Sequence, residues 1–370
     1  MSLQPLKIVI SGGGTGGHIF PAIAIADAIR AKSPDSQILF VGAKGRMEMV
    51  RVPEAGYAIM GLMISGFQRK FTLDNFAFPF KLISSLYKAR KILKDFRPDV
   101  VVGVGGYASG PTLRMAILLG IKTLIQEQNS FPGITNRLLG KKADRICVAY
   151  DSMDKWFPKH KTLLTGNPLR KTAINIEGKR KEALNFFGFN EKNPVVLIVG
   201  GSQGARAINE AIAANIIKLK DSSLQIIWQT GQSYFNTARQ IVEQNKAESF
   251  IHPFEFISRM DLAYAAADMI VSRAGAMSIA EISMVQKPAI FVPLPTAAED
   301  HQTKNALRLA DKNAALLVKN SEASNKLADE IIRLAFNEDL RNELSVNIGR
   351  FAKAEATEMI VNEIFKLAGR

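Results

Sequence analysis

The residues best suited to chemistry begin in a glycine-rich stretch near the start of the chain. Residues 11–22 read SGGGTGGHIFPA and follow the apolar run LKIVI. His18 is the one titratable side chain of this stretch, and an imidazole changes its charge near neutral pH, as a general base must. The glycines leave room for a phosphate or a sugar beside the backbone. We therefore take His18 as a candidate base, although a histidine that orders the loop or binds phosphate fits the same residues.

The glycine spacing also raises a different chemistry, because Gly12, Gly14 and Gly17 satisfy the G-x-G-x-x-G pattern of a dinucleotide-binding turn. A nicotinamide site needs, in addition, an acidic residue at the end of the second strand to hold a ribose. Here QILFVG continues with alanine and lysine, and no acid occurs before Glu48. The sequence therefore disfavours a nicotinamide enzyme. Tight packing of a strand on a helix would explain one such loop, but glycine clusters recur at 102–111 and 200–204.

The elements that must position these loops are short apolar runs that alternate with helical stretches. A first series of expected strands covers 7–11, 37–42, 99–105, 122–127 and 145–150, and a second covers 194–201, 224–231, 250–256, 268–275, 289–295 and 314–320. This alternation predicts βαβ units in parallel sheets. We expect an α/β protein with two Rossmann-like, doubly wound domains that face each other across a cleft. The expected domains are 1–166 and 167–344, with a helix at about 345–370 that can pack back on the first.

Composition limits the classes of protein and of partner. The chain has 370 residues, 47% of them hydrophobic, and a formal charge of +14 from 48 Lys and Arg against 34 Asp and Glu. A packed core follows, and the cationic excess favours an anionic partner. Cys147 is the only cysteine, and the four histidines show no H-x-x-x-H pairing, so we expect neither a disulfide nor a zinc site. We find neither a signal peptide nor a membrane span, and we expect a cytosolic protein.

Seven motifs in a fixed order carry a family resemblance. They are GGGTGGHIFPAIAIA, GGYASGP, QEQNSFPGITNRLL, GNPLR, GGSQGARAIN, SRAGAMSIAEI and DHQTKNA, which together extend from residue 7 to about residue 310. In these motifs the chain resembles the undecaprenyldiphospho-muramoylpentapeptide β-N-acetylglucosaminyltransferases of peptidoglycan synthesis. The resemblance implies a GT-B fold, in which the C-terminal domain binds mainly the nucleotide sugar and the N-terminal domain binds the lipid acceptor. Another GT-B enzyme or a UDP-sugar epimerase is the alternative.

The implied reaction is an inverting transfer of N-acetylglucosamine from UDP-N-acetylglucosamine to the 4-hydroxyl of an undecaprenyl-diphosphate-linked N-acetylmuramoyl-pentapeptide. Such a reaction needs a base near the hydroxyl and positive potential at the departing diphosphate. The chain contains no D-x-D sequence, which often holds a metal in glycosyltransferases of another fold. We therefore expect no metal and no cofactor, and we expect helix N-termini and backbone amides to stabilise the leaving group.

The resemblance also implies roles for individual residues. It places Ser202 at the diphosphate, the backbone of Ile257 at the uracil and Glu281 at the uridine ribose. Gln302 and Asn129 would bind the transferred sugar. The full set of expected donor-binding residues is Thr15, Gly16, Gly17, Asn129, Arg170, Ser202, Ile257, Ala276, Met277, Glu281 and Gln302.

Several of these assignments have structural alternatives. Glu281 could be a salt-bridge or helix-dipole carboxylate, and Arg170 could tie the hinge between the domains. Arg273 could add charge near the diphosphate. Glu127 is a second, weaker candidate for acid or base catalysis, and a role in ordering its loop fits it better. Gln126 stands where relatives can carry a histidine, so this position cannot transfer protons here.

The positive charge is concentrated near an aromatic segment, residues 66–94. Phe71, Phe76 and Phe78 lie close to Lys81, Lys88, Arg90 and Lys91. An apolar surface rimmed by cations suits an anionic bilayer surface, although aromatics in the core with cations on a solvated helix face would give the same pattern. Because the implied acceptor lipid stays in the membrane, we expect a peripheral protein at the cytoplasmic face of the inner membrane. We find no nucleic-acid-binding module and expect no nucleic-acid partner.

Overall fold

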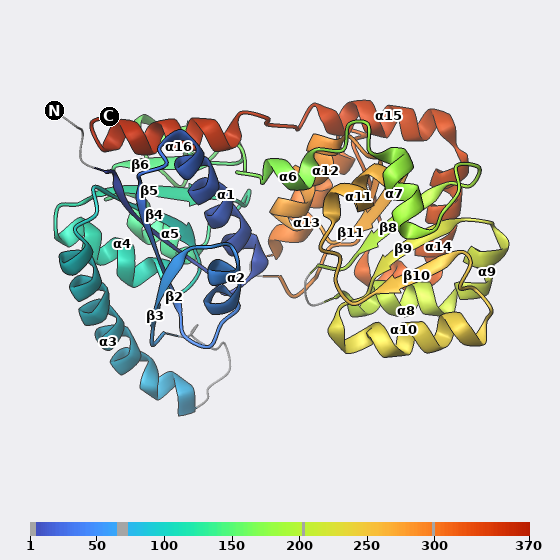
Figure 1. The fold of residues 1–370 in the computed structure, drawn as a ribbon, viewed down its shortest axis with the longest axis horizontal. Coiled ribbons are helices and arrows are strands. Elements are labelled where there is room, and N and C mark those ends of the chain that lie inside the picture. The colour runs from blue at the N-terminus through green and yellow to red at the C-terminus, as the bar shows by residue number, and fades with distance from the viewer. Residues whose placement is uncertain (1–4, 65–72, 202–203, 298–299) are drawn as a thin grey trace. The chain divides into compact units, whose positions relative to one another are not determined.

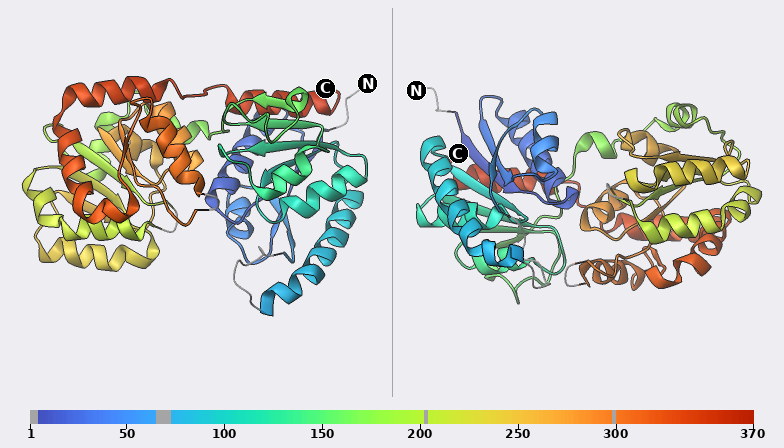
Figure 2. Two further views of the ribbon diagram at one scale, coloured as in Figure 1. Left: turned by 180° about the vertical axis from the view of Figure 1, so that it is seen from behind. Right: turned by 90° about the horizontal axis from the view of Figure 1, so that it is seen from below.

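The computed structural model describes residues 5–64, 73–201, 204–297 and 300–370. The chain forms two compact units, and we treat each by itself. Unit 1 consists of Met1–Arg170 together with Lys353–Arg370, and unit 2 consists of Lys171–Ala352. Each unit contains one parallel sheet with helices on both of its faces (Figures 1 and 2). Unit 1 is therefore built from two separate stretches of the sequence.

The sheet of unit 1 has the order β3-β2-β1-β4-β5-β6-β7, and all neighbouring strands run parallel. Its strands are β1 (Lys7–Gly12), β2 (Gln37–Ala43), β3 (Ala58–Leu62), β4 (Val100–Gly105), β5 (Lys122–Glu127), β6 (Arg145–Val148) and β7 (Thr162–Leu164). The near-continuous Val, Ile and Leu runs of the inner strands β1, β4, β5 and β6 are buried, as strands covered on both faces require. The edge strands β3 and β7 are partly exposed.

Helices cover the two faces of this sheet in separate groups. The helices are α1 (Gly16–Lys32), α2 (Glu48–Glu54), α3 (Leu73–Phe96), α4 (Ser109–Leu118), α5 (Ile134–Gly140) and α16 (Ala356–Leu367). One core contains side chains from α1, α2 and α16, and the other contains side chains from α3, α4 and α5. The C-terminal helix α16 lies beside α1 (Figure 1). An ion pair at 2.6 Å between Arg145 and Glu363 also ties it to β6.

The sheet of unit 2 has the order β10-β9-β8-β11-β12-β13, again entirely parallel. Its strands are β8 (Val195–Val199), β9 (Gln225–Gln229), β10 (Ile251–Phe254), β11 (Met269–Ser272), β12 (Ala289–Phe291) and β13 (Leu316–Leu317). Its helices are α6 (Lys171–Ile174), α7 (Arg180–Phe187), α8 (Arg206–Ala214), α9 (Ile216–Asp221), α10 (Gln232–Gln244), α11 (Met260–Ala266), α12 (Ala276–Val285), α13 (His301–Ala310), α14 (Ala323–Phe336) and α15 (Glu338–Gly349).

The predicted doubly wound α/β architecture is confirmed, because both sheets are parallel and covered on both faces. Every expected strand overlaps an observed one, but the sequence reading missed two strands of unit 1. β3 has the sequence AIMGL, which has no alternation to distinguish it from a helix. β7 is a three-residue edge strand just before the expected domain boundary at residues 166–167, where the turn residues Gly166, Asn167 and Pro168 gave no indication of a strand.

Each sheet has one point where the strand order reverses, between β1 and β4 in unit 1 and between β8 and β11 in unit 2. Ligands of such folds bind beyond the carboxyl ends of the strands at this switch point. The loops that leave these four strands contain GGGTGGH, GGYASGP, GGSQGA and SRAGAM. Topology therefore brings the predicted loops to the switch point of each unit. Within the described ranges, no helix has both the length and the hydropathy needed to cross a bilayer.

Candidate functional site

The loop after β1 holds His18 in a defined orientation. His18 lies in the first turn of α1, and its Nδ1 is 3.1 Å from the carbonyl oxygen of Gly13 and 3.4 Å from Oγ1 of Thr15. A carbonyl oxygen only accepts hydrogen bonds, so Nδ1 must donate its proton to Gly13. A neutral ring in this arrangement carries its lone pair on Nε2. In this tautomer Nε2 is the ring nitrogen that can accept a proton.

The loop after β4 packs directly on this histidine loop. Gly105 and Gly106 both have positive φ, at +96° and +87°. A Cβ on Gly105 would lie 2.9 Å from Nε2 of His18, and one on Gly106 would lie 2.2 Å from the carbonyl oxygen of Gly13. Only glycine allows both the backbone conformation and this approach. Gly105 and Gly106 therefore allow the loop after β4 to pack against His18 and Gly13.

Arg170, from the GNPLR motif, reaches the same end of unit 1. Its guanidinium lies 4.9 Å from the ring centroid of Phe20, a cation–π contact two residues beyond His18. Thr15 and Gly17 are exposed, and Gly16 and Arg170 are half-buried. The structure thus brings together Arg170 and the expected donor-binding residues of the first loop.

Glu127 ends β5 and is almost completely buried. Its Oε1 accepts from the backbone and side-chain nitrogens of Asn129 at 3.0 and 3.3 Å. Its Oε2 accepts from the backbone of Gly133 at 3.2 Å and from Nδ2 of Asn136 at 2.8 Å. Burial raises the pKa of Glu127, and these four hydrogen bonds oppose that shift. The carboxylate therefore orders the loop that presents Asn129, which favours the structural role over acid or base catalysis.

Gln126 lies beneath this loop and is fully buried. Its Nε2 donates to Oδ1 of Asn167 at 3.1 Å, and Nδ2 of Asn167 donates to the carbonyl of Gln128 at 3.1 Å. Gln128 in turn donates to the carbonyl of Val104 at 2.8 Å. These amides connect the ends of β4 and β5 to the GNPLR segment. Gln126 therefore has a structural role in this network, as expected of an amide side chain that cannot transfer protons.

In unit 2, one buried glutamine links two predicted donor-binding segments. Gln229, at the end of β9, accepts from the backbone N–H of Ile257 at 3.0 Å. Its Nε2 donates to the carbonyl of Gly201 at 3.1 Å. The N–H of Ile257 is thus held by Gln229 in this structure. The sequence reading did not single out Gln229, because a glutamine at a strand end carries no motif of its own.

Glu281 lies on α12, which begins at Ala276 after the SRAG turn. The hydroxyl of Tyr264 donates to its Oε2 at 2.8 Å. Tyr264 is 3% exposed. Burial, and then the charge of Glu281, raise its pKa well above the usual value. The hydroxyl therefore remains a donor at physiological pH and orients the carboxylate. Ala276 is buried and Met277 half-buried at the first turn of the same helix.

Two other predicted residues of unit 2 hold backbone segments. Oε1 of Gln302 accepts from the N–H of Leu294 at 2.9 Å, which fixes the loop after β12. Nη1 of Arg273 donates to the carbonyls of Val292 and Pro293 and to Oδ1 of Asn320. The hydrogen bonds of this nitrogen therefore fix the segment that follows β12. Ser202 lies outside the described residues.

The expected membrane patch falls partly on α3. Phe71 lies outside the described residues, and Phe76 and Phe78 belong to α3 with side chains that are not described. Lys81 and Lys88 are half-buried, and Lys88 donates to the carbonyl of Gly61 at 2.8 Å. The exposed face instead presents Phe80, Ile83 and Tyr87, which are 76%, 65% and 72% exposed, followed by Arg90 and Lys91. The sequence indicated Phe80 as one of the phenylalanines of this segment but did not assign Ile83 and Tyr87 to the patch.

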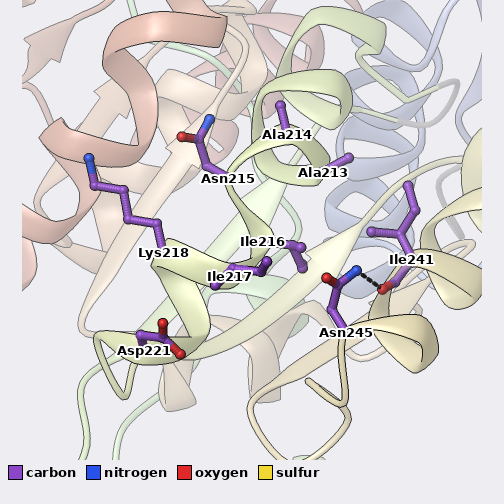
Figure 3. A pocket seen from close by; sticks show the side chains of 9 residues that line it. All are labelled: Ala213, Ala214, Asn215, Ile216, Ile217, Lys218, Asp221, Ile241 and Asn245. Atoms are coloured by element: carbon purple, nitrogen blue, oxygen red, sulfur yellow. Dashed lines mark hydrogen bonds between the residues drawn. The ribbon is translucent and has the colours of Figure 1, made fainter.

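A cavity of about 820 Å³ lies elsewhere, beside the C-terminal ends of α8 and α10 (Figure 3). It lies toward the amino ends of the strands, whereas the glycine loops lie at their carboxyl ends. None of the predicted site residues lines it. Among its polar side chains, Nδ2 of Asn245 donates to the carbonyl of Ile241, and Lys218 forms an ion pair with Asp329 of α14. In the described part of the chain, no three His, Cys, Asp or Glu side chains are grouped so that they could hold a metal.

The chain is similar to known proteins over nearly its full length. The models of the glycosyltransferase family 28 N-terminal and C-terminal domains match residues 8–148 and 195–360. A UDP-N-acetylglucosamine–N-acetylmuramyl-(pentapeptide) pyrophosphoryl-undecaprenol N-acetylglucosamine transferase from Phocaeicola vulgatus is 53% identical, over 99% of this chain and 98% of the relative. A protein of the same name from Cytophaga hutchinsonii is 52% identical, over 98% and 97%. The crystal structure of MurG from Acinetobacter baumannii has a TM-score of 0.76 and 31% identity, covering 98% of this chain and 100% of that chain.

Proposed function

The chain belongs to glycosyltransferase family 28, and we propose that it transfers N-acetylglucosamine from UDP-N-acetylglucosamine to lipid-linked N-acetylmuramoyl-pentapeptide in peptidoglycan synthesis. The observation that carries this proposal is the 53% identity, over 99% of the chain, to a relative named for that reaction. The glycine loops at both switch points support it, because they give each unit a site of the kind that binds phosphate and sugar.

In the proposed reaction, the 4-hydroxyl of the muramoyl sugar attacks the anomeric carbon of the donor. A new glycosidic C–O bond forms, the bond to the diphosphate breaks, and UDP leaves with its electron pair. His18 acts as the base: its Nδ1–H is held by Gly13, so Nε2 takes the hydroxyl proton. Arg170, stacked on Phe20 near the same loop, supplies positive charge.

Unit 2 supplies most of the contacts to the donor in this proposal. A carboxylate can accept hydrogen bonds from both hydroxyls of a ribose, and Glu281 is held for this role by Tyr264. The N-terminus of α12, with Ala276 and Met277, faces the diphosphate. The backbone of Ile257 reads the uracil, and Gln302 binds the transferred sugar. Asn129 is the candidate sugar-binding residue of unit 1. Ser202 completes the proposed set, with Thr15, Gly16 and Gly17 from the first loop.

The membrane part of the proposal rests on α3. Phe80, Ile83 and Tyr87 follow one another at helical spacing on an exposed face, and Arg90 and Lys91 continue it toward the C-terminal end. Such a surface suits the headgroup region of an anionic bilayer. The polyprenyl chain of the acceptor stays in the bilayer, and the nucleotide sugar is supplied in the cytoplasm. We therefore place the protein at the cytoplasmic face of the inner membrane.

The decisive experiment incubates the protein with labelled UDP-N-acetylglucosamine and a lipid-linked muramoyl-pentapeptide acceptor, with and without a chelator. We expect label in the lipid product and release of UDP in both conditions. Absence of labelled lipid would overturn the proposed function, and loss on chelation would overturn only its metal-independent part. His18→Ala should lower kcat by about 10²-fold, whereas the exposed His160→Ala should not. Near-normal turnover of His18→Ala would remove His18 as the base.

The membrane proposal has a separate test. Ile83→Glu combined with Tyr87→Glu should weaken binding to vesicles of phosphatidylglycerol and phosphatidylcholine by about 10-fold or more, since two exposed apolar side chains are lost. Phe336→Glu provides the control, because Phe336 is also exposed but belongs to unit 2. Binding of soluble UDP should be unchanged in both variants. Equal vesicle binding by the double variant and the control would contradict the assignment of this face.

A further inference from the structure

Glu48 is a buried carboxylate that the proposed reaction does not use. It is the first residue of α2 and is 1% exposed. Its Oε2 accepts from the backbone N–H of Gly14 at 2.9 Å, and its Oε1 accepts from that of Ala43 at 2.9 Å. The carboxylate therefore connects the glycine loop after β1 to the end of β2. Both of its oxygens face backbone donors rather than a ribose.

Two glycines make room for this carboxylate. A Cβ on Gly13 would lie 2.2 Å from Oε1 of Glu48, and one on Gly42 would lie 2.6 Å from its Cγ. Real Cβ atoms do not come so close to other atoms, so any side chain at either position would displace Glu48. The site is thus formed by residues of the β1 loop, the end of β2 and the start of α2.

One peptide group connects Glu48 to His18. The N–H of Gly14 and the carbonyl of Gly13 belong to the same planar trans peptide, so they point in opposite directions. Glu48 holds the N–H, and Nδ1 of His18 donates to the carbonyl at 3.1 Å. Fixing one end of this peptide fixes the other, and a carboxylate on the N–H also polarises the carbonyl into a better acceptor.

We propose that Glu48 is a positioning residue which, through the Gly13–Gly14 peptide, sets the orientation and the tautomer of His18. Both glycines have positive φ, at +152° and +87°, so this peptide can turn more easily than one between larger residues. Without the carboxylate, the N–H of the half-buried Gly14 loses its acceptor, and the peptide reorients to find another. The carbonyl then leaves Nδ1. This role rests on the proposed function of His18 as the base.

The first test is spectroscopic. Nitrogen-15 NMR of the full-length protein, with His18→Ala used to assign the signal, reports which ring nitrogen of neutral His18 carries the proton. We expect the proton on Nδ1 in the wild type and a mixture of tautomers in Glu48→Ala, which removes both acceptor oxygens. A wild-type His18 protonated on Nε2 would overturn the inference. So would a folded Glu48→Ala protein with the wild-type tautomer. This readout does not depend on any transfer activity, so it remains decisive if the proposed function fails.

The second test is kinetic. Glu48→Ala should lower kcat by about 10²-fold, the effect expected of a displaced catalytic group, with a much smaller change in KM for the donor. In the His18→Ala background the same substitution should cost almost nothing more, because both act through one group. Losses that multiply in the double variant, or an unchanged kcat, would overturn the inference.

Asp144→Asn is the matched control. Asp144 also accepts from a backbone N–H, that of Thr123 at 2.9 Å, but near the amino ends of β5 and β6, away from the glycine loops. It should lower the melting temperature without changing kcat or the tautomer of His18.

Discussion

The hydroxyl of Tyr264 offers a prediction whose size can be worked out from the structure. Tyr264 is nearly inaccessible on α11, and its hydroxyl makes a 2.8 Å hydrogen bond to Oε2 of Glu281. Because its pKa is raised well above the usual value, the group is a neutral donor throughout the working range of pH. Tyr264→Phe removes this donor and leaves the ring. The carboxylate of Glu281 then loses the contact that fixes its direction toward the ribose in our proposal.

A hydrogen bond to a charged group contributes about 1.5–3 kcal/mol. Glu281 is half-buried, so water can replace part of the lost contact, and the low end of that range applies. A loss of about 1.5 kcal/mol corresponds to a Kd for UDP that is about 10-fold higher. The stability of unit 2 should fall less, because the phenyl ring still fills its place in the core.

Calorimetry with UDP and with 2′,3′-dideoxy-UDP measures this effect. We expect Tyr264→Phe to weaken UDP binding about 10-fold and to leave binding of the dideoxy analogue nearly unchanged, because that analogue has no hydroxyl for Glu281 to accept from. Tyr57→Phe is the control: its hydroxyl also bonds a carboxylate, that of Asp27 at 2.6 Å, but in unit 1. An equal loss for both nucleotides, or no loss for UDP, would refute the assignment of Glu281 to the ribose.

Three further predictions concern stability and the loops. Hydrogen bonds, above all from Arg259, hold the pKa of Asp261 well below its usual range, so its stabilisation is present above about pH 4 and disappears as the pH falls further. Asp261→Asn should lower the melting temperature at pH 7, and the difference from the wild type should shrink between pH 4 and pH 2. Gln229→Leu breaks both of its loop contacts and should raise the Kd for UDP severalfold in calorimetry; an unchanged Kd would contradict this. Gly106→Ala places a Cβ 2.2 Å from the carbonyl of Gly13 and should lower both the melting temperature and kcat, whereas a wild-type kcat would show that the loop contact is dispensable.

The architecture could be predicted because it depends on patterns that are local in the sequence. Buried strands of parallel sheets are short apolar runs, and each glycine cluster directly follows such a run. The motifs that indicated the family lie in these same loops, and the family is confirmed by the relatives. The roles of the donor-binding residues stay predictions, which the calorimetric and kinetic experiments address.

The partners of the site residues could not be predicted, because they come from elements that are distant in the sequence. Glu48 was noted only as an acid that comes too late to serve a ribose, yet α2 turns it back onto the N–H of Ala43 at the end of β2. Tyr264 precedes Glu281 by 17 residues and lies on another helix. On α3, side-chain direction follows from how the helix packs against α4, so counting aromatics did not identify Ile83 and Tyr87.

The composition of unit 1 from two distant stretches has a consequence for biosynthesis. Ile360, Val361 and Ile364 of α16 belong to the same core as Ile8 and Ile10 of β1. A ribosome releases the N-terminal stretch first, so a nascent chain of about 170 residues carries a bare apolar face until the last helix arrives. Unit 2 is contiguous and can fold before unit 1 is finished. A premature stop near residue 350 would therefore yield a protein in which unit 2 folds, whereas unit 1 stays incompletely folded and is bound by chaperones or degraded by proteases.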